Sequence, residues 1–61
     1  MNLEDKIGTR QAILLGGHRD GEVITCLNGV KTLLIPIIEE RKLAVYKETI
    51  KDVFEFSMIE P

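Results

Sequence analysis

The residues of this chain that could do chemistry gather in residues 16–21, which read Gly-Gly-His-Arg-Asp-Gly. They include the only histidine and three of the five glycines. Because glycine tolerates a positive φ, this segment predicts a tight turn with exposed backbone N–H groups. On such a turn Arg19 could grip a phosphate and His18 could donate a hydrogen bond to it, while the ring of Tyr46 could stack on a base. The candidate ligand-binding residues are therefore Gly17, His18, Arg19, Asp20 and Tyr46.

The same residues also fit a purely structural interpretation. Asp20-Gly21 is common turn chemistry, so His18 and Arg19 could simply decorate a solvated loop. The segment is not a Walker loop, because no Gly-Lys-Ser/Thr closes it, and it lacks the spacing and the following helix of a dinucleotide fingerprint. Aromatic rings dominate cores and interfaces, so Tyr46 equally fits a packing role. Both interpretations stay open on the sequence alone.

The chain holds no recognisable set of nucleophile, base and orienting group, and we expect no enzyme and no catalytic residues. His18 and Asp20 lie two residues apart on one loop, which seldom forms the pocket that acid–base catalysis needs. Cys26 could pair with His18 as a nucleophile across a hairpin, but a lone cysteine in an apolar strand is typically a small core residue. The sequence offers neither a four-ligand zinc set nor a carboxylate cluster, so no metal and no cofactor are expected.

Five short apolar runs must position these residues. The first three span residues 12–15, 22–27 and 32–38, and turns rich in glycine join them. Pro36 cannot donate to a β-ladder, which places the third run at a sheet edge or at a bulge. The last two runs, over residues 43–50 and 53–59, are rich in β-branched and aromatic residues.

These runs predict a mostly β fold: a small antiparallel meander, or a partly open barrel, of about five short strands in a single domain over residues 1–61. The alternative is an α+β fold with a helix over residues 39–54, because Leu43, Tyr46 and Ile50 also share one helical face. Residues 1–10 are expected to form a frayed tail or one short helical turn.

The size of the chain predicts self-association. A chain of 61 residues with 44% apolar residues buries only about 60% of the surface that its unfolded form exposes. One cysteine cannot form an intrachain disulfide, and no metal set is present, so the remaining way to stabilise so small a core is a homo-oligomer.

Charge and hydropathy limit the partners and the compartment. The net charge of −2 argues against nucleic acid, whose binding needs a basic surplus on one face. No apolar stretch approaches the roughly 20 residues of a membrane span, and the polar start is unlike a secretory signal. A single thiol fits a reducing compartment, so we expect a cytoplasmic protein that does not contact a membrane.

Several of these features also occur together in one group of proteins. Gly16-Gly17, Asp20-Gly21, the proline in the third apolar run and Tyr46 ahead of an aromatic strand together resemble small uncharacterised proteins of bacteriophages. Those proteins open with an apolar strand into Gly-Gly-x-x-Asp-Gly and end with a tyrosine-led strand pair. The resemblance spans residues 12–58 and implies the all-β interpretation and the cytoplasm of a host cell. One departure is that no glycine lies between Tyr46 and Phe54, where a tight hairpin favours one.

Two functions follow as expectations. The first is a non-enzymatic phage accessory protein that binds a phosphorylated small ligand at clefts between its subunits. The phage resemblance, not the residue chemistry, narrows this to sequestering a nucleotide immune signal of the host, an anti-defence role. The second is a protein-interaction module that inhibits a host protein, or a minor virion protein, acting through the apolar ridge around Pro36.

Overall fold

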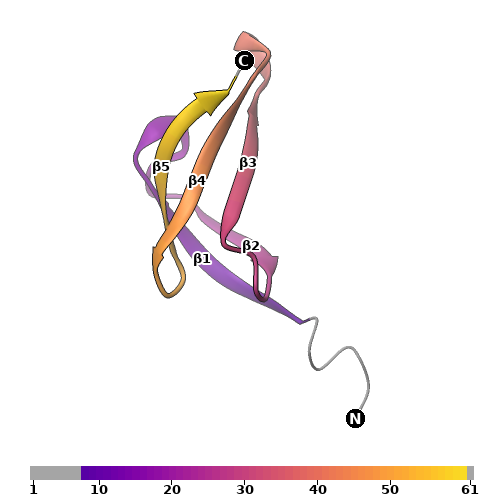
Figure 1. Cartoon of the computed structure of the whole chain (residues 1–61), viewed down its shortest axis with the longest axis vertical. Coiled ribbons are helices and arrows are strands. Elements are labelled where there is room, and N and C mark those ends of the chain that lie inside the picture. The colour runs from indigo at the N-terminus through magenta and orange to yellow at the C-terminus, as the bar shows by residue number, and fades with distance from the viewer. Residues whose placement is uncertain (1–7, 61) are drawn as a thin grey trace.

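Five strands form one mixed, strongly curled sheet in the computed structural model, which describes residues 8–60 (Figure 1). The prediction of a mostly β fold is confirmed, and the predicted alternative of a helix over residues 39–54 is wrong, since most of that range belongs to β4 and β5. One 3₁₀ turn follows the first strand and another follows the third. The elements are β1 (Thr9–Leu15), η1 (Gly17–Arg19), β2 (Val23–Leu27), β3 (Thr32–Ile37), η2 (Ile38–Glu40), β4 (Lys42–Ile50) and β5 (Val53–Glu60).

Each strand coincides with one of the five apolar runs to within a few residues. The largest difference is at the start of β1, which begins at Thr9 rather than at residue 12. Thr9 and Arg10 therefore belong to the sheet and not to a tail or a helical turn. The rest of that prediction concerns residues 1–7 and lies outside the described residues.

The strand order corrects the predicted antiparallel meander. The order across the sheet is β2-β1-β5-β4-β3, so β2 and β3 are consecutive in the chain but lie at opposite edges. β5 lies between β1 and β4, parallel to β1 and antiparallel to β4. The sheet curls into a half-barrel, which agrees with the alternative of a partly open barrel, and Figure 1 shows β1 and β2 crossing the direction of the other three strands.

The turn after β2 explains why β3 does not fold back onto it. The Val30 N–H donates to the Leu27 carbonyl at 3.3 Å, so the predicted turn at Asn28-Gly29 does form. Of its two central residues only Gly29 has a positive φ, at 88°. A two-residue hairpin of the favoured type I′ needs a positive φ at both positions. The chain therefore leaves the β2 edge and begins β3 on the far side of the half-barrel.

The concave face of the sheet holds the core. Residues two apart along a strand share one face, and the buried positions follow that period, with Ala12 and Leu14 on β1 and Ala44 and Tyr46 on β4. Cys26 also lies in this core, which confirms its assignment as a small hydrophobe. The core cluster consists of Ala12, Leu14, Cys26, Ile35, Ile37, Ala44, Tyr46 and Phe54.

The β4–β5 hairpin manages without the glycine that its tight turn favours. Asp52 takes the left-handed conformation there, with φ 64°. Aspartate is one of the few residues that adopts this conformation readily, because its short side chain can hydrogen-bond locally. The missing glycine in the sequence therefore does not prevent a hairpin between Ile50 and Val53.

Pro36 lies on the free edge of the sheet, as its missing N–H predicts. The Glu48 N–H donates to the Lys31 carbonyl at 2.9 Å, which fixes the alternation along β3. Leu33, Ile35 and Ile37 are then the residues that bond β4, and Thr32, Leu34 and Pro36 point their backbone groups outward. The proline thus removes a donor from the open edge without costing the sheet a hydrogen bond.

Replacing Pro36 by threonine tests this role. Pro36→Thr returns a third outward donor to β3, so we expect the apparent mass at a given concentration to rise as edges pair. The free energy of unfolding should change by less than about 1 kcal/mol, because position 36 makes no ladder bond. Light scattering measures the mass and urea denaturation the stability. An unchanged mass would contradict the edge-blocking role.

Candidate functional site

The turn over residues 16–21 satisfies most of its own backbone donors. The carboxylate of Asp20 accepts a hydrogen bond from the Gly16 N–H at 2.6 Å. The Gly21 N–H donates to the Leu14 carbonyl at 2.6 Å, and the Glu22 N–H donates to the Arg19 carbonyl at 3.1 Å. The turn therefore supplies its own anion at Gly16, within the segment expected to bind a phosphate.

Tyr46 holds this turn in place from the core of the sheet. Its side chain is fully buried on β4. The hydroxyl donates to the Gly16 carbonyl at 2.8 Å and accepts from the Arg19 N–H at 3.2 Å. The ring meets that of Phe56 edge to face, with centroids 5.7 Å apart and an interplanar angle of 71°. The structure thus gives Tyr46 a positioning role, and stacking on a ligand base stays a prediction that would need the ring uncovered.

Gly17 is required by this close packing. Its φ is +67°, a conformation that side chains rarely adopt. A Cβ built at this position would lie 2.5 Å from the Tyr46 hydroxyl and 2.8 Å from the Phe56 Cδ1. The glycine therefore lets the backbone of η1 lie directly against the two aromatic rings.

Several donors of the turn remain available to a ligand. The backbone N–H groups of Gly17 and His18 have no hydrogen-bond partner among residues 8–60, and both residues are exposed. The Arg19 Nη1 contacts both carboxylate oxygens of Glu22, at 3.0 and 3.1 Å, and its buried Nε has no partner within the described part of the chain.

His18 and Arg19 line a hollow of about 220 Å³ together with the end of β3 and with η2. The residues on the opposite side are Pro36, Ile37, Ile38 and Glu39. Ile38 is 85% exposed, so an apolar side chain stands in solvent beside the two basic groups. The structure thereby joins two features that lie far apart in the sequence, the glycine-rich turn and the apolar ridge around Pro36.

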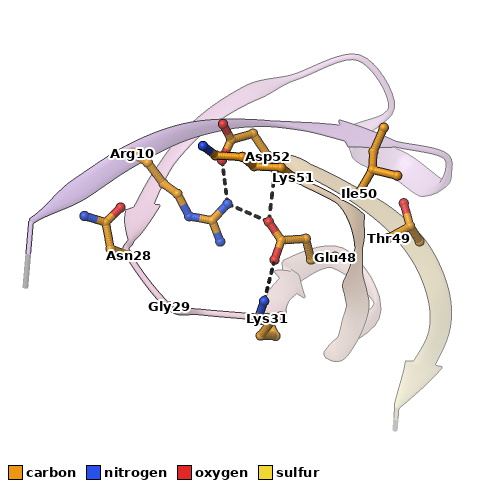
Figure 2. A pocket seen from close by; sticks show the side chains of 9 residues that line it. All are labelled: Arg10, Asn28, Gly29, Lys31, Glu48, Thr49, Ile50, Lys51 and Asp52. Carbon is orange, nitrogen blue, oxygen red and sulfur yellow. Dashed lines mark hydrogen bonds and ion pairs between the residues drawn. The ribbon is translucent and has the colours of Figure 1, made fainter.

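A second hollow, of about 380 Å³, lies at the other end of β1 (Figure 2). The Arg10 Nη1 lies 2.6 Å from a Glu48 carboxylate oxygen and 2.7 Å from an Asp52 carboxylate oxygen. The Arg10 Nη2 donates to the Val30 carbonyl at 2.6 Å, and the guanidinium lies 5.4 Å from the centroid of the Phe54 ring. The Lys31 ammonium approaches the second Glu48 oxygen at 3.5 Å.

The charges of this network reinforce one another. The Asp52 N–H donates to the Glu48 carboxylate at 3.0 Å, and this bond, together with the Arg10 guanidinium, holds the pKa of Glu48 below its ordinary value. The carboxylates of Asp52 and Glu48 in turn raise the pKa of Arg10. The carboxylates and the Arg10 guanidinium already satisfy one another. The network of Arg10, Glu48 and Asp52, here called the clasp, therefore chiefly ties β1 to the β4–β5 hairpin.

Arg10, Glu48 and Asp52 are not among the residues predicted from the sequence, although a signal for two of them exists. Extending the inward period of two from Ala12 back to Arg10, and from Tyr46 forward to Glu48, places both charged residues on the concave face. Opposite charges on one buried face predict an ion pair, because an unpaired charge is costly there. Asp52 carries no such signal, since its place depends on the turn geometry.

The described part of the chain gives little basis for other site chemistry. Among residues 8–60, no three His, Cys, Asp or Glu side chains gather where they could hold a metal ion. The same residues include no helix with the length and apolarity to cross a bilayer. A scan against protein-family models and searches of curated proteins and of solved structures found no match.

Removing the Tyr46 hydroxyl tests the anchoring of the turn. Tyr46→Phe leaves the Gly16 carbonyl and the Arg19 N–H without their partner, so we expect a loss of about 1–2 kcal/mol in the free energy of unfolding. Amide hydrogen exchange at Arg19 should also accelerate. Thr49→Val is the matched control, because it removes an exposed hydroxyl bonded to Glu55 and should change stability by less than about 0.5 kcal/mol. Equal effects of the two variants would contradict the anchor.

The clasp predicts a loss of stability in acid. Because the folded protein lowers the pKa of Glu48, its stabilising effect is complete above the unfolded value of about 4.3 and is lost as the pH falls through the folded pKa. We expect Glu48→Gln to be less stable than wild type near neutral pH and to show a smaller loss below about pH 4.3.

Urea denaturation across this pH range measures both effects. Glu40→Gln on η2 is the control, because the exposed Glu40 makes no ion pair within residues 8–60. This variant should keep the wild-type pH dependence. A Glu48→Gln protein with the full wild-type loss in acid would rule out the clasp as its source.

Proposed function

We propose that this chain is a non-enzymatic binding protein that takes a phosphorylated small ligand in the hollow between η1 and η2. The observation that carries the proposal is the meeting of a basic pair, His18 and Arg19, with the apolar side chains of Pro36 and Ile38 in one hollow. A phosphorylated ligand with an apolar ring presents the same two chemistries side by side.

The phosphate end of such a ligand suits the η1 side of the hollow. The unpartnered N–H groups of Gly17 and His18 would donate to phosphate oxygens, as exposed backbone donors in turns commonly do. Arg19 would exchange its contact with Glu22 for the phosphate, and this exchange is cheap because an exposed ion pair contributes only about 0–1 kcal/mol. Asp20 would act through its bond to the Gly16 N–H, which keeps the turn in shape.

The ring end of the ligand suits Ile38 and Pro36, which are both exposed. Glu39 lines the same side and would oppose a second negative charge. A hollow of about 220 Å³ is smaller than the roughly 300–1,000 Å³ of typical ligand pockets. A homo-oligomer, in which a second copy closes the open side of the hollow, would supply the remaining surface.

The resemblance to small phage proteins narrows this proposal further. Such a protein would act in the host cytoplasm, and its ligand would be a nucleotide immune signal of the host, held out of reach of the defence system. The narrower form depends on that analogy and not on residue chemistry.

A second candidate function is a protein-interaction module that inhibits a host protein or belongs to the virion. The convex face of the sheet favours this function. Val45 on that face is only 5% exposed, although it does not belong to the core cluster. Its cross-strand neighbours Leu34 and Met58 are about half exposed. This apolar row ends at the free β3 edge, where a partner protein could cover it.

Titration calorimetry with a panel of cyclic and linear nucleotides tests the ligand proposal. We expect at least one nucleotide to bind, and Arg19→Ala and His18→Ala to weaken it by about tenfold or more, because each removes a charge-assisted hydrogen bond. Glu39→Gln should tighten binding by removing a like charge. An absence of heat with every nucleotide at high concentration would end the proposal.

Lys31→Ala supplies the matched control for these variants. Lys31 lines the other hollow, so its removal should leave nucleotide binding unchanged. Circular dichroism confirms that each variant is folded. Equal losses from Lys31→Ala and Arg19→Ala would place the ligand elsewhere or indicate a general charge effect.

A further inference from the structure

The open edge of β2 differs from that of β3 in being unprotected. The Leu14 N–H donates to the Glu22 carbonyl at 2.8 Å, and the Asn28 N–H donates to the Gly8 carbonyl at 2.9 Å. These two bonds fix the alternation, so Ile24 and Cys26 bond β1 in the antiparallel ladder. Val23, Thr25 and Leu27 therefore turn their backbone N–H groups toward the free edge.

Nothing in β2 prevents another strand from pairing there. Strand edges are normally blocked by charge, by proline, by a bulge or by a covering segment. Residues 23–27 read Val-Ile-Thr-Cys-Leu, with neither a charge nor a proline. These outward residues are also exposed to solvent: Val23 is 63% exposed and Leu27 is 51% exposed. The β3 edge, by contrast, loses its third donor at Pro36.

We propose that a second copy of this chain pairs with β2 through this edge, antiparallel, about a two-fold axis at Thr25. In that register Val23 faces Leu27 of the second copy and Thr25 faces its own counterpart. All three residues are outward-pointing on both copies, so every opposed pair exchanges two N–H···O bonds, about six in total. The sheets of the two copies then continue into each other across the axis.

The side chains along β2 fit a second copy of this chain. The register brings each exposed Val23 against an exposed Leu27, and such cross-strand pairs stabilise sheets. Continued by one position, it sets Glu22 opposite Asn28, which avoids a clash of like charges. The same two-fold pairing at β3 would oppose Thr32 to Pro36 and lose donors.

This inference rests on the proposed function only in that both include a homo-oligomer. It does not require the phosphorylated ligand. Thr25→Lys places two ammonium groups opposite each other at the axis, so we expect it to abolish the dimer. Thr32→Lys puts the same change on the exposed β3 edge and should leave the dimer intact. Light scattering over a dilution series gives the mass, with a doubled mass expected for wild type and for Thr32→Lys, and the monomer mass for Thr25→Lys.

The register has its own test in paired charges. The double variant V23E/L27K sets a glutamate opposite a lysine twice across the axis, so it should remain dimeric, whereas V23K/L27K should be monomeric. This comparison keeps the proposal testable even if Thr25→Lys does not fold. A wild-type protein that is monomeric at every concentration would overturn the inference, as would dimers that survive V23K/L27K or that Thr32→Lys disrupts.

Calorimetry on the same variants separates this inference from the ligand proposal. A monomeric Thr25→Lys protein that still binds nucleotide would support the edge pairing and show that the hollow is complete in one chain. A dimeric wild type that binds no nucleotide would support the pairing and end the ligand proposal.

Discussion

The ion pairs of Arg10 with Glu48 and Asp52 are the constraint on which the rest of the structure depends. A single curled sheet has one concave face, and its core is open wherever no second layer covers it. Arg10 closes one end of that face by joining β1 to the β4–β5 hairpin and to the Val30 carbonyl before β3. Because Arg10 is the cation that both Glu48 and Asp52 contact, removing Arg10 would take a shared partner from two carboxylates at once.

The glycine-rich turn closes the other end of the same face. Tyr46 reaches up from the core to hold the turn, and Gly17 lets the backbone lie against the Tyr46 and Phe56 rings. The turn consequently covers the core and also exposes the unpartnered backbone N–H groups of Gly17 and His18. This double role explains why one short segment fits both interpretations of its sequence: Asp20 and Tyr46 support the fold, while His18 and Arg19 face the hollow.

The two edges of the sheet have different chemistry for a reason that depends on backbone alternation. On β3, Pro36 falls at an outward position and blunts the edge. On β2, Val23, Thr25 and Leu27 fall outward and remain able to pair. A half-barrel this small leaves large apolar side chains exposed, and in the dimer that we propose the open, neutral β2 edge would supply both hydrogen bonds and apolar surface to a second copy.

The sequence alone predicted the local features: the first three strands, the turns at residues 16–21 and at Asn28-Gly29, the place of Pro36 at an edge or a bulge, and the core position of Cys26. These depend on propensity, glycine and proline, which act over a few residues. For residues 39–54 the sequence left strands and a helix both open, and the structure decided for strands. Only the tertiary structure decided that β5 lies between β1 and β4, that Arg10 meets Glu48 across 38 residues and that Tyr46 holds Gly16 across 30. Such contacts depend on how the whole sheet curls, because no local pattern specifies which distant strands become neighbours.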